Sequence, residues 1–400
     1  MADAAGKPQP RRAIVRGFAL ATALFLGACS SLVPRDAGPP PRPEITAPRP
    51  TTPKPLQPGI PEDVERHRVA LLVPLSGTNA AVGRSLANAT QLALLDTRSE
   101  RVRITSYDTA SGAAAAAQRA IAEGARLILG PLLAEDVRAV APIARRANVP
   151  VISFSNDTGV AGDGAYLMGY TPGQSIERVV DHARRSGVSQ FAGLMPSGLY
   201  GERASTAFLR AVESAGGEVT TMQTYDRSAG SIAAAVTRIG RNAPYQAVLI
   251  ADSSGTASLA VPALRRGGGT NVRVLGTELW NTDAAIGSKA ALNNAWFASV
   301  SDTLYRQYAT KYRARFGQAP YRLSSLGYDA VLLTVRIARD WRVGDAFPES
   351  NLRDSGGFSG LDGAFRFGRD GIAERALEVQ EVRGGTTVTV SPAPAGFGSR

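Results

Sequence analysis

Residues 69–95 form the first segment whose apolar pattern predicts folded structure. The run 69–73 is entirely apolar, polar and turn-forming residues follow at 74–79, and apolar residues then recur near helical spacing. A strand that is apolar on both faces is typical of a parallel sheet covered by helices on both sides. In such sheets ligands bind beside the loops that leave the carboxyl ends of the strands, so the turn at 74–83 lies where a site is expected.

The same alternation continues to about residue 155. Three further strands and two further helices are predicted, the strands at 102–107, 127–129 and 149–152 and the helices at 112–123 and 135–146. Strands that alternate with helices in this way indicate a doubly wound parallel sheet.

A second unit of the same kind begins at Thr171. Thr171, Pro172 and Gln174 form a capping box at the start of a helix, after which strands and helices alternate again up to strand 272–275. Beyond an irregular stretch, helices are predicted at 303–316 and 321–341, and a closing hairpin at 365–367 with 377–382. We expect the chain to cross back to the first lobe after residue 276 and to cross again near residue 345.

The predicted fold is therefore α/β, with two doubly wound parallel-sheet lobes that face each other across an interlobe cleft. The first lobe would comprise residues 65–170 and about 277–345, and the second would comprise residues 171–276 and about 346–390.

The N-terminal 28 residues have the features of a secretion signal. Four cations precede an apolar stretch at 18–26 that is too short to span a bilayer, and the tetrapeptide Leu-Gly-Ala-Cys ends at Cys29. This tetrapeptide resembles the bacterial lipobox, which predicts lipidation of Cys29; the alternative is an ordinary signal peptide with a nearby cysteine. Ser30 resembles the residue that follows the cysteine in outer-membrane lipoproteins. Cys29 is the only cysteine, so no intramolecular disulfide can form.

Residues 29–64 predict a tether. Eleven prolines lie between 34 and 61, and at about 3.1 Å per residue such a segment could reach on the order of 100 Å. Its role is either to reach a distant partner in the envelope or only to space the domain from the membrane.

The net charge of +11 does not by itself indicate nucleic-acid binding. The excess is nearly all arginine, scattered in pairs such as Arg145-Arg146, Arg184-Arg185 and Arg265-Arg266. These pairs fall near predicted helix ends, where a cation complements the helix dipole. Helix-end placement is therefore favoured over a nucleic-acid surface, which would need interleaved aromatic residues.

Catalytic motifs are largely missing. The segment from Gly77 to Ser85 has one residue too many for a phosphate-binding loop and carries Arg84 where that loop has lysine. Only two histidines, His67 and His182, could serve a serine triad or a histidine-rich metal site. We expect no enzyme activity, no metal and no cofactor.

Small polar residues recur at the predicted strand ends of both lobes. Hydroxyls and helix N-termini can hold a carboxylate, and a facing acid can hold an amine; the alternative for each residue is a turn or cap. The predicted ligand-binding residues of the cleft are Ser76, Asn79, Tyr107, Asp108, Gly130, Pro131, Ser153, Ser155, Tyr200, Asp252, Glu278 and Trp280.

Several segments together resemble the type I periplasmic-binding-protein fold, as in the Leu/Ile/Val-binding proteins of ABC importers. They are VALLVPLSG with Gly83, ARLILGPL, NVPVIS, Tyr200-Gly201, Leu326 to Ala330, and Gly360 to Gly363 with Phe365. The resemblance covers residues 68–383 and implies two lobes that close on a small molecule.

Three details are closer to one branch, the lipoprotein activators of penicillin-binding proteins. They are the turns at 74–77 and 107–110 and the segment 130–133 followed by Val137. This resemblance implies a periplasmic protein, lipid-anchored to the outer membrane of a Gram-negative bacterium, that binds a peptidoglycan synthase. The best-known activators carry a helical-repeat domain ahead of this module, whereas here only the tether precedes it.

A solute receptor for a small amino acid or related anion is the alternative function. The amino-acid-binding relatives usually carry an acid in the loop before Tyr200-Gly201, and this chain has none there. An amine-binding role would therefore fall to Asp252 or Glu278.

Overall fold

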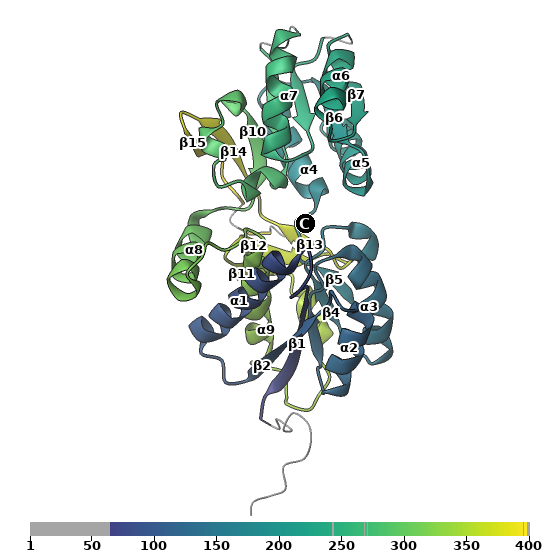
Figure 1. Ribbon diagram of the computed structural model, residues 1–400, viewed down its shortest axis with the longest axis vertical. Coiled ribbons are helices and arrows are strands. Elements are labelled where there is room, and N and C mark those ends of the chain that lie inside the picture. The colour runs from purple at the N-terminus through teal and green to yellow at the C-terminus, as the bar shows by residue number, and fades with distance from the viewer. Residues whose placement is uncertain (1–64, 242–243, 268, 270, 395, 398–400) are drawn as a thin grey trace, which may run out of the picture. The chain divides into compact units, whose positions relative to one another are not determined.

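In the computed structural model, the opening strand is the middle of the first lobe. The model describes residues 65–241, 244–267, 269, 271–394 and 396–397, all within the unit Pro58–Arg400. Figure 1 shows that they build two lobes, each a sheet flanked by helices. The first sheet has the order β2-β1-β3-β4-β5 and is entirely parallel. Its strands are β1 (His67–Val73), β2 (Val102–Asp108), β3 (Leu127–Leu129), β4 (Val151–Ser153) and β5 (Ala165–Leu167).

The apolar run of β1 supplies both faces of this sheet. Val69, Leu71 and Val73 pack with one core, while Ala70 and Leu72 pack with the other. The first core lies under α1 (Ala80–Thr97), and the second lies under α2 (Ala113–Ala122) and α3 (Ala134–Arg146). All five of these strand residues are at most 1% exposed, as expected of a sheet covered on both sides.

The second lobe repeats this plan around a larger sheet of order β15-β14-β10-β9-β8-β6-β7. Strands β6 to β10 run parallel, and β14 and β15 add an antiparallel edge. Two cores cover the faces, one with α4 and α5 and one with α6 and α7. The strands are β6 (Gln190–Pro196), β7 (Glu218–Tyr225), β8 (Ala247–Ile250), β9 (Arg273–Gly276), β10 (Trp296–Ser299), β14 (Glu378–Arg383) and β15 (Thr386–Ser391). The helices are α4 (Pro172–Arg185), α5 (Leu199–Ser214), α6 (Ala229–Gly240) and α7 (Ser254–Arg266).

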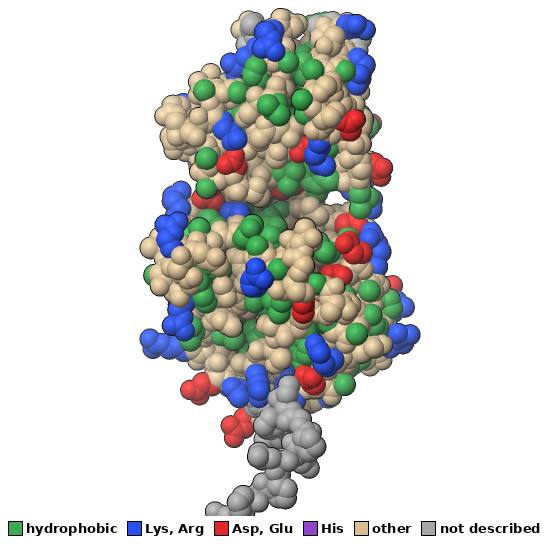
Figure 2. Space-filling view, in the orientation of Figure 1, with side chains coloured by type: hydrophobic (Ala, Val, Ile, Leu, Met, Phe, Trp, Pro, Cys, Tyr) green, Lys and Arg blue, Asp and Glu red, His purple; other side chains and the backbone are tan. Residues whose placement is uncertain are grey.

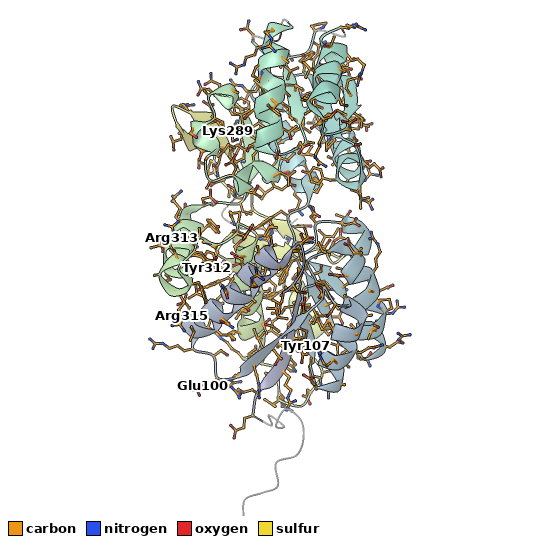
Figure 3. The ribbon with its side chains drawn as sticks, in the orientation of Figure 1. Glu100, Tyr107, Lys289, Tyr312, Arg313 and Arg315 are labelled. Carbon is orange, nitrogen blue, oxygen red and sulfur yellow. The ribbon has the colours of Figure 1, made fainter. Side chains whose placement is uncertain are left out.

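Between β10 and β14 the chain returns to the first lobe. Helix α9 (Ser324–Ile337) packs along α1, and α8 (Thr303–Phe316) buries Tyr308 and Tyr312 in the same core. In Figure 3, Tyr312 is turned toward the lobe while Arg313 and Arg315 of the same helix lie at the outer edge. A small antiparallel sheet completes this segment, with β11 (Phe358–Gly360), β12 (Gly363–Phe367) and β13 (Ala373–Arg375).

The structure corrects three predictions about the last third of the chain. The first crossing follows β10 rather than residue 276, because the buried residues 296–299 form a strand of the second sheet instead of an irregular loop. The second crossing follows β13 rather than residue 345, because Phe358, Phe365 and Phe367 pack in the first-lobe core. The predicted closing hairpin is also wrong, since β12 pairs with β11 and β13, whereas β14 pairs with β10 and β15.

The arginine pairs lie where the sequence predicted. They occupy the last turns of α3, α4 and α7. On the face shown in Figure 2, blue Lys and Arg side chains are spread over both lobes among red acidic ones. The predicted signal peptide, Cys29 and the predicted tether lie outside the described residues.

Candidate functional site

The turn after the first strand of each lobe is built in the same way. A β-carbon at Gly83 would lie 1.8 Å from the Pro74 carbonyl oxygen, and one at Gly201 would lie 1.6 Å from the Pro196 carbonyl oxygen. Only glycine allows the helix that follows to approach the end of the strand so closely. The two turns, 74–83 and 196–201, therefore keep their loops short beside the carboxyl ends of β1 and β6.

Asp108 organises the first of these turns. Its carboxylate accepts a hydrogen bond from the Ser76 hydroxyl at 2.6 Å and from the backbone N–H groups of Leu75 and Ala110 at 2.8 and 3.0 Å. The Ser76 hydrogen bond is the main reason why the pKa of Asp108 is lowered. The predicted pair Ser76 and Asp108 is thus brought together, but the two side chains bond to each other. Asn79 precedes α1, and its exposed side chain caps no helix N–H.

The prediction that Tyr107 lines the cleft is wrong. Its hydroxyl donates to Glu123 at 2.6 Å and its ring lies in the core beneath α2 and α3. Successive side chains of a strand point to opposite faces of the sheet, so Tyr107 and Asp108 cannot serve one site.

The loops after β3 and β4 also bond to each other. The Ser153 hydroxyl, fully buried, donates to the carbonyl of Pro131 at 2.9 Å, and the Ser155 hydroxyl accepts from the Asp157 N–H at 3.2 Å. Gly130 has a positive φ, and a β-carbon there would lie 2.1 Å from the Leu72 carbonyl oxygen. The Gly130-Pro131 peptide bond is cis.

In the second lobe, Asp252 and Trp280 serve the loop structure. The Asp252 carboxylate accepts from the Tyr225 hydroxyl and from Arg227, both at 3.0 Å. Trp280 is fully buried in the core under α6 and α7, and its ring N–H donates to the Asp252 carbonyl at 2.9 Å. The prediction that Trp280 faces the cleft is therefore wrong, because a 3₁₀ turn at Glu278–Thr282 rotates its ring into the lobe.

Glu278 is the predicted acid that does face the lobe junction. Ser175 and Tyr200 both donate to its carboxylate, the latter at 2.9 Å. Tyr200 also lies 3.0 Å from the Thr277 hydroxyl. Burial raises the pKa of Glu278 and raises that of Tyr200 well above its usual value.

A buried ionic cluster lies where the chain passes between the lobes. Arg322 donates to the Asp362 carboxylate at 2.8 Å and forms an ion pair with Asp302 at 3.3 Å. Tyr170 and Ser325 also donate to Asp362, which is completely buried. Although burial opposes it, the charges of Arg322 and Arg375 hold the pKa of Asp362 below its usual value.

This cluster explains two of the quoted sequence motifs, although sequence reasoning did not assign them to the site. Asp329 accepts a hydrogen bond from the Leu361 N–H at 2.6 Å, and a β-carbon at Gly360 would lie 2.3 Å from the Asp329 carboxyl carbon. The signal was present in the sequence, since Asp329 and Asp362 are acids within otherwise apolar or glycine-rich motifs.

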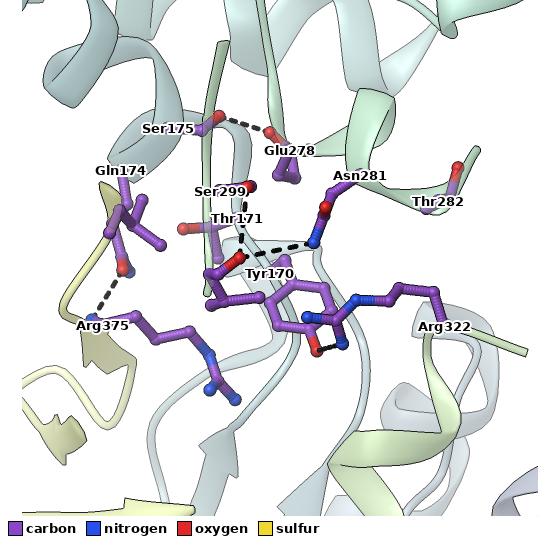
Figure 4. A pocket seen from close by; sticks show the side chains of 12 residues that line it. Tyr170, Thr171, Gln174, Ser175, Glu278, Asn281, Thr282, Ser299, Arg322 and Arg375 are labelled. Atoms are coloured by element: carbon purple, nitrogen blue, oxygen red, sulfur yellow. Dashed lines mark hydrogen bonds between the residues drawn. The ribbon is translucent and has the colours of Figure 1, made fainter. Parts of the chain in front are cut away.

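A pocket opens beside the cluster at the lobe junction (Figure 4). Its cavity offers about 20 Å³ to the centres of water molecules. The pocket is lined by Tyr170, Thr171, Gln174, Ser175, Glu278, Asn281, Thr282, Ser299, Val300, Arg322, Arg375 and Leu377. Of the twelve predicted cleft residues, only Glu278 is among them.

A second connection between the lobes involves Asp157. Its buried carboxylate lies 2.5 Å from Arg138 of α3 in the first lobe and 3.4 Å from Arg203 of α5 in the second. Asp157 also accepts from the Gly159 N–H at 3.0 Å. The carboxylate therefore links the two lobes through the ion pair with Arg203.

Within the described residues, three or more His, Cys, Asp or Glu side chains do not gather as metal ligands. None of the helices described is both long and apolar enough to cross a membrane.

Comparison with known proteins gives one family. A family model described as "Periplasmic binding protein" matches residues 67–386. An uncharacterized protein of Rickettsia prowazekii (strain Madrid E) is 25% identical over 181 residues, which are 44% of this chain and 47% of that protein. The match thus spans about half the length of that relative.

Solved structures share the fold at low sequence identity. A leucine binding protein, LivK, from Thermotoga maritima has a TM-score of 0.63 and 20% identity, covering 82% of this chain and 98% of its own. A putative branched-chain amino acid ABC transporter protein from Rhodospirillum rubrum has a TM-score of 0.70 and 20% identity, covering 81% and 100%. A solute binding protein of an ABC transporter from Rhodopseudomonas palustris, solved with 3,4-dihydroxybenzoic acid, has a TM-score of 0.64 and 19% identity, covering 82% and 97%.

Proposed function

This chain belongs to the periplasmic binding protein family, and we propose that it acts without catalysis, as a regulator that binds a penicillin-binding protein and promotes peptidoglycan synthesis. One observation carries the proposal. Several polar side chains that the sequence places at the cleft bond to one another, as Ser76 does with Asp108 and Tyr200 with Glu278. A two-lobe module of this kind is better suited to presenting a surface than to delivering a solute.

The connections between the lobes favour the same function. Solute receptors trap their ligand by closing two lobes, and such hinge motions need connections that can change. Here Asp157 of the first lobe pairs with Arg203 of the second lobe at 3.4 Å, whereas the buried Arg322–Asp362 pair lies within the first lobe beside the junction. The pair across the junction favours the present arrangement of the lobes, which suits a docking partner.

The predicted N-terminal segments fit this role. Lipidation at Cys29 would anchor the chain, and several acyl chains give stable anchoring where one does not. We propose that the anchor lies in the outer membrane and that the proline-rich tether lets the lobes reach a synthase elsewhere in the envelope.

Direct binding tests the proposal. The chain without its first 28 residues would be immobilised and exposed to the bifunctional penicillin-binding proteins of the same organism. The matched control is a leucine-binding protein of the same fold, which should retain none of them. If no synthase binds this chain more tightly than the control, the regulatory function is excluded.

A solute receptor is the second candidate, favoured by the pocket at the lobe junction. Glu278 lines one part of this pocket and Arg375 another, which places an acid and a base around one small volume. A thermal-shift screen of amino acids and aromatic acids tests this candidate, since a ligand at 100 times its dissociation constant stabilises the folded state by about 2.7 kcal/mol. A stabilising hit would support the receptor, and no shift with any of these compounds would count against it.

A further inference from the structure

A polar groove lies at the edge of the second sheet opposite to the lobe junction. β9 begins at Arg273, β10 begins at Trp296 and the antiparallel strand β14 ends at Arg383, so these three strand ends share one edge. At their other ends, β9 and β10 lead to Glu278 and Ser299 of the junction pocket. The groove offers about 500 Å³ to the centres of water molecules, which is enough for a small polar molecule. It is lined by Arg265, Asn271, Val272, Arg273, Val274, Asn293, Asn294, Ala295, Glu381 and Arg383.

Two of the lining arginines use only a small part of their hydrogen-bonding capacity. Arg265 at the end of α7 donates to the Asn293 carbonyl at 3.3 Å, and Arg273 donates to the Asn294 carbonyl at 2.5 Å. Within the part of the chain that the structure describes, neither guanidinium forms an ion pair. A guanidinium carries several N–H groups in a fixed planar arrangement, so most of those of Arg265 and Arg273 are available to a ligand.

Trp296 and Glu381 fix the positions of Arg273 and of Arg383. The Arg273 guanidinium lies over the Trp296 ring at 4.1 Å, and the ring N–H of Trp296 donates to Glu381 at 2.8 Å. The other carboxylate oxygen of Glu381 accepts from Arg383 at 2.7 Å. Side chains that are held before binding lose less conformational entropy when a ligand arrives. Arg273 and Arg383 are therefore preorganised at the edge of the sheet.

The charge around the groove is positive. Glu381 is the only acid among the described residues that line it, and the hydrogen bond from Arg383 holds the pKa of Glu381 below its usual value. Glu381 is 6% exposed and both of its oxygens are bonded, so it lies beneath the arginines. Three cations and one acid leave two positive charges. A phosphate monoester carries up to about two negative charges at pH 7, and the planar guanidinium binds phosphate through two parallel hydrogen bonds.

We propose that this groove binds a phosphate group carried on a polar molecule, with Arg265, Arg273 and Arg383 as its ligands. The exposed side chains of Asn293 and Asn294 stand beside the arginines, where their amides can bind hydroxyl groups of the carrier. Two sources carry such a group, a soluble phosphorylated polyol and the headgroup of a phospholipid. The site does not rest on the regulatory function proposed above, because it lies away from the lobe junction and its test does not measure peptidoglycan synthesis.

Two probes with the same phosphate monoester test the proposal and separate its sources. Calorimetric titration of residues 29–400 with glycerol phosphate measures the soluble source, with glycerol as the unphosphorylated control. Co-sedimentation with phosphatidylcholine vesicles that contain phosphatidic acid measures the lipid source, with pure phosphatidylcholine vesicles as control. We expect at least one phosphate monoester to bind and neither control to do so.

A pair of neighbouring arginines provides matched variants. Arg265→Met should weaken binding by about tenfold or more, because a charge-assisted hydrogen bond is lost. Arg266→Met removes the same charge from the same end of α7 but does not alter a residue that lines the groove, so the dissociation constant should stay unchanged. Arg383→Met, on the other side of the groove, should weaken binding as Arg265→Met does.

The outcomes decide as follows. Binding of glycerol phosphate supports a soluble ligand, and binding of phosphatidic acid vesicles alone supports a lipid headgroup. Binding of neither probe to the natural sequence overturns the proposal, whatever the stability of the variants. Equal weakening by Arg265→Met and Arg266→Met also overturns it, because the attraction would then come from the net charge of the helix end and not from the groove.

Discussion

Replacing Arg322 with methionine tests whether the ionic cluster at the lobe junction holds the fold together. Methionine keeps much of the packing of the arginine stem, including contact with the ring of Tyr305, which the guanidinium covers at 4.1 Å. The substitution removes the cation from Asp362, whose side chain is 0% exposed, and from Asp302. Removing one partner of a buried ion pair costs about 3–5 kcal/mol, because the other charge stays buried and unpaired. We therefore expect Arg322→Met to lower the free energy of unfolding by about that amount.

The matched control is Arg145→Met. Arg145 pairs with Asp163 at 2.8 Å, but the two side chains are 60% and 82% exposed. Exposed pairs contribute about 0–1 kcal/mol, so this variant should unfold close to the natural protein.

Urea denaturation followed by tryptophan fluorescence measures both variants. Trp341 lies in the first lobe, and Trp280 and Trp296 lie in the second, so the combined emission reports unfolding of both. Adding Asp362→Asn to Arg322→Met should recover part of the loss, because the unpaired charge is then removed. If Arg322→Met costs no more than Arg145→Met, the cluster does not stabilise the fold and the reasoning is refuted.

Three further predictions concern single residues. Gly201→Ala should destabilise the fold by about 1–3 kcal/mol or more, because the added β-carbon would meet a backbone carbonyl. The control Gly230→Ala, whose β-carbon would meet no atom within 4 Å, should be neutral or stabilising by up to about 1 kcal/mol. Equal urea midpoints for the two variants would contradict this difference in stability. Burial raises the pKa of Asp329 to about 7, so between about pH 4 and pH 7 the unfolded chain binds fewer protons at this residue than the folded chain does. The contribution of Asp329 to stability therefore falls as the pH rises, and Asp329→Asn should remove that decrease. If the urea midpoint of the variant depends on pH as that of the natural protein does, the raised pKa of Asp329 is contradicted. Asp157→Ala removes the acceptor of the Gly159 N–H, so hydrogen exchange at Gly159 should become faster; unchanged exchange would show that Asp157 does not hold its loop.

The fold was largely predictable because the apolar runs are unambiguous. Residues 69–73 are apolar at every position. A strand of this kind is buried on both sides only in a sheet that helices cover on both faces, and the structure places residues 69–73 in such a sheet. The errors fell on the short strands of the crossing segments. Residues 296–299 follow three 3₁₀ turns and carry no alternation long enough to identify a strand. The three strands within 358–375 pair only with each other and gain their burial from α9 and the first-lobe core, which local sequence does not reveal.

The site was less predictable for a different reason. Polar residues at strand ends could be located, but whether each points outward or bonds to its neighbour depends on loop geometry. Ser76 and Asp108 were correctly placed at one edge of the sheet, yet they pair with each other. Arg322 and Arg375 gave no signal because Asp362, the buried acid that Arg322 pairs with, and Met168, whose carbonyl Arg375 binds, lie far from them in sequence.

The rate of glycan-strand synthesis tests the central claim most directly. The lobes and tether, residues 29–400, would be added to the organism's bifunctional penicillin-binding protein with its lipid-linked precursor, alongside a leucine-binding protein of the same fold as control. We predict that this chain increases the rate and the control does not, with no glycan formed by the chain alone. Equal rates with and without the chain would contradict the claim that this member of the periplasmic binding protein family regulates a peptidoglycan synthase.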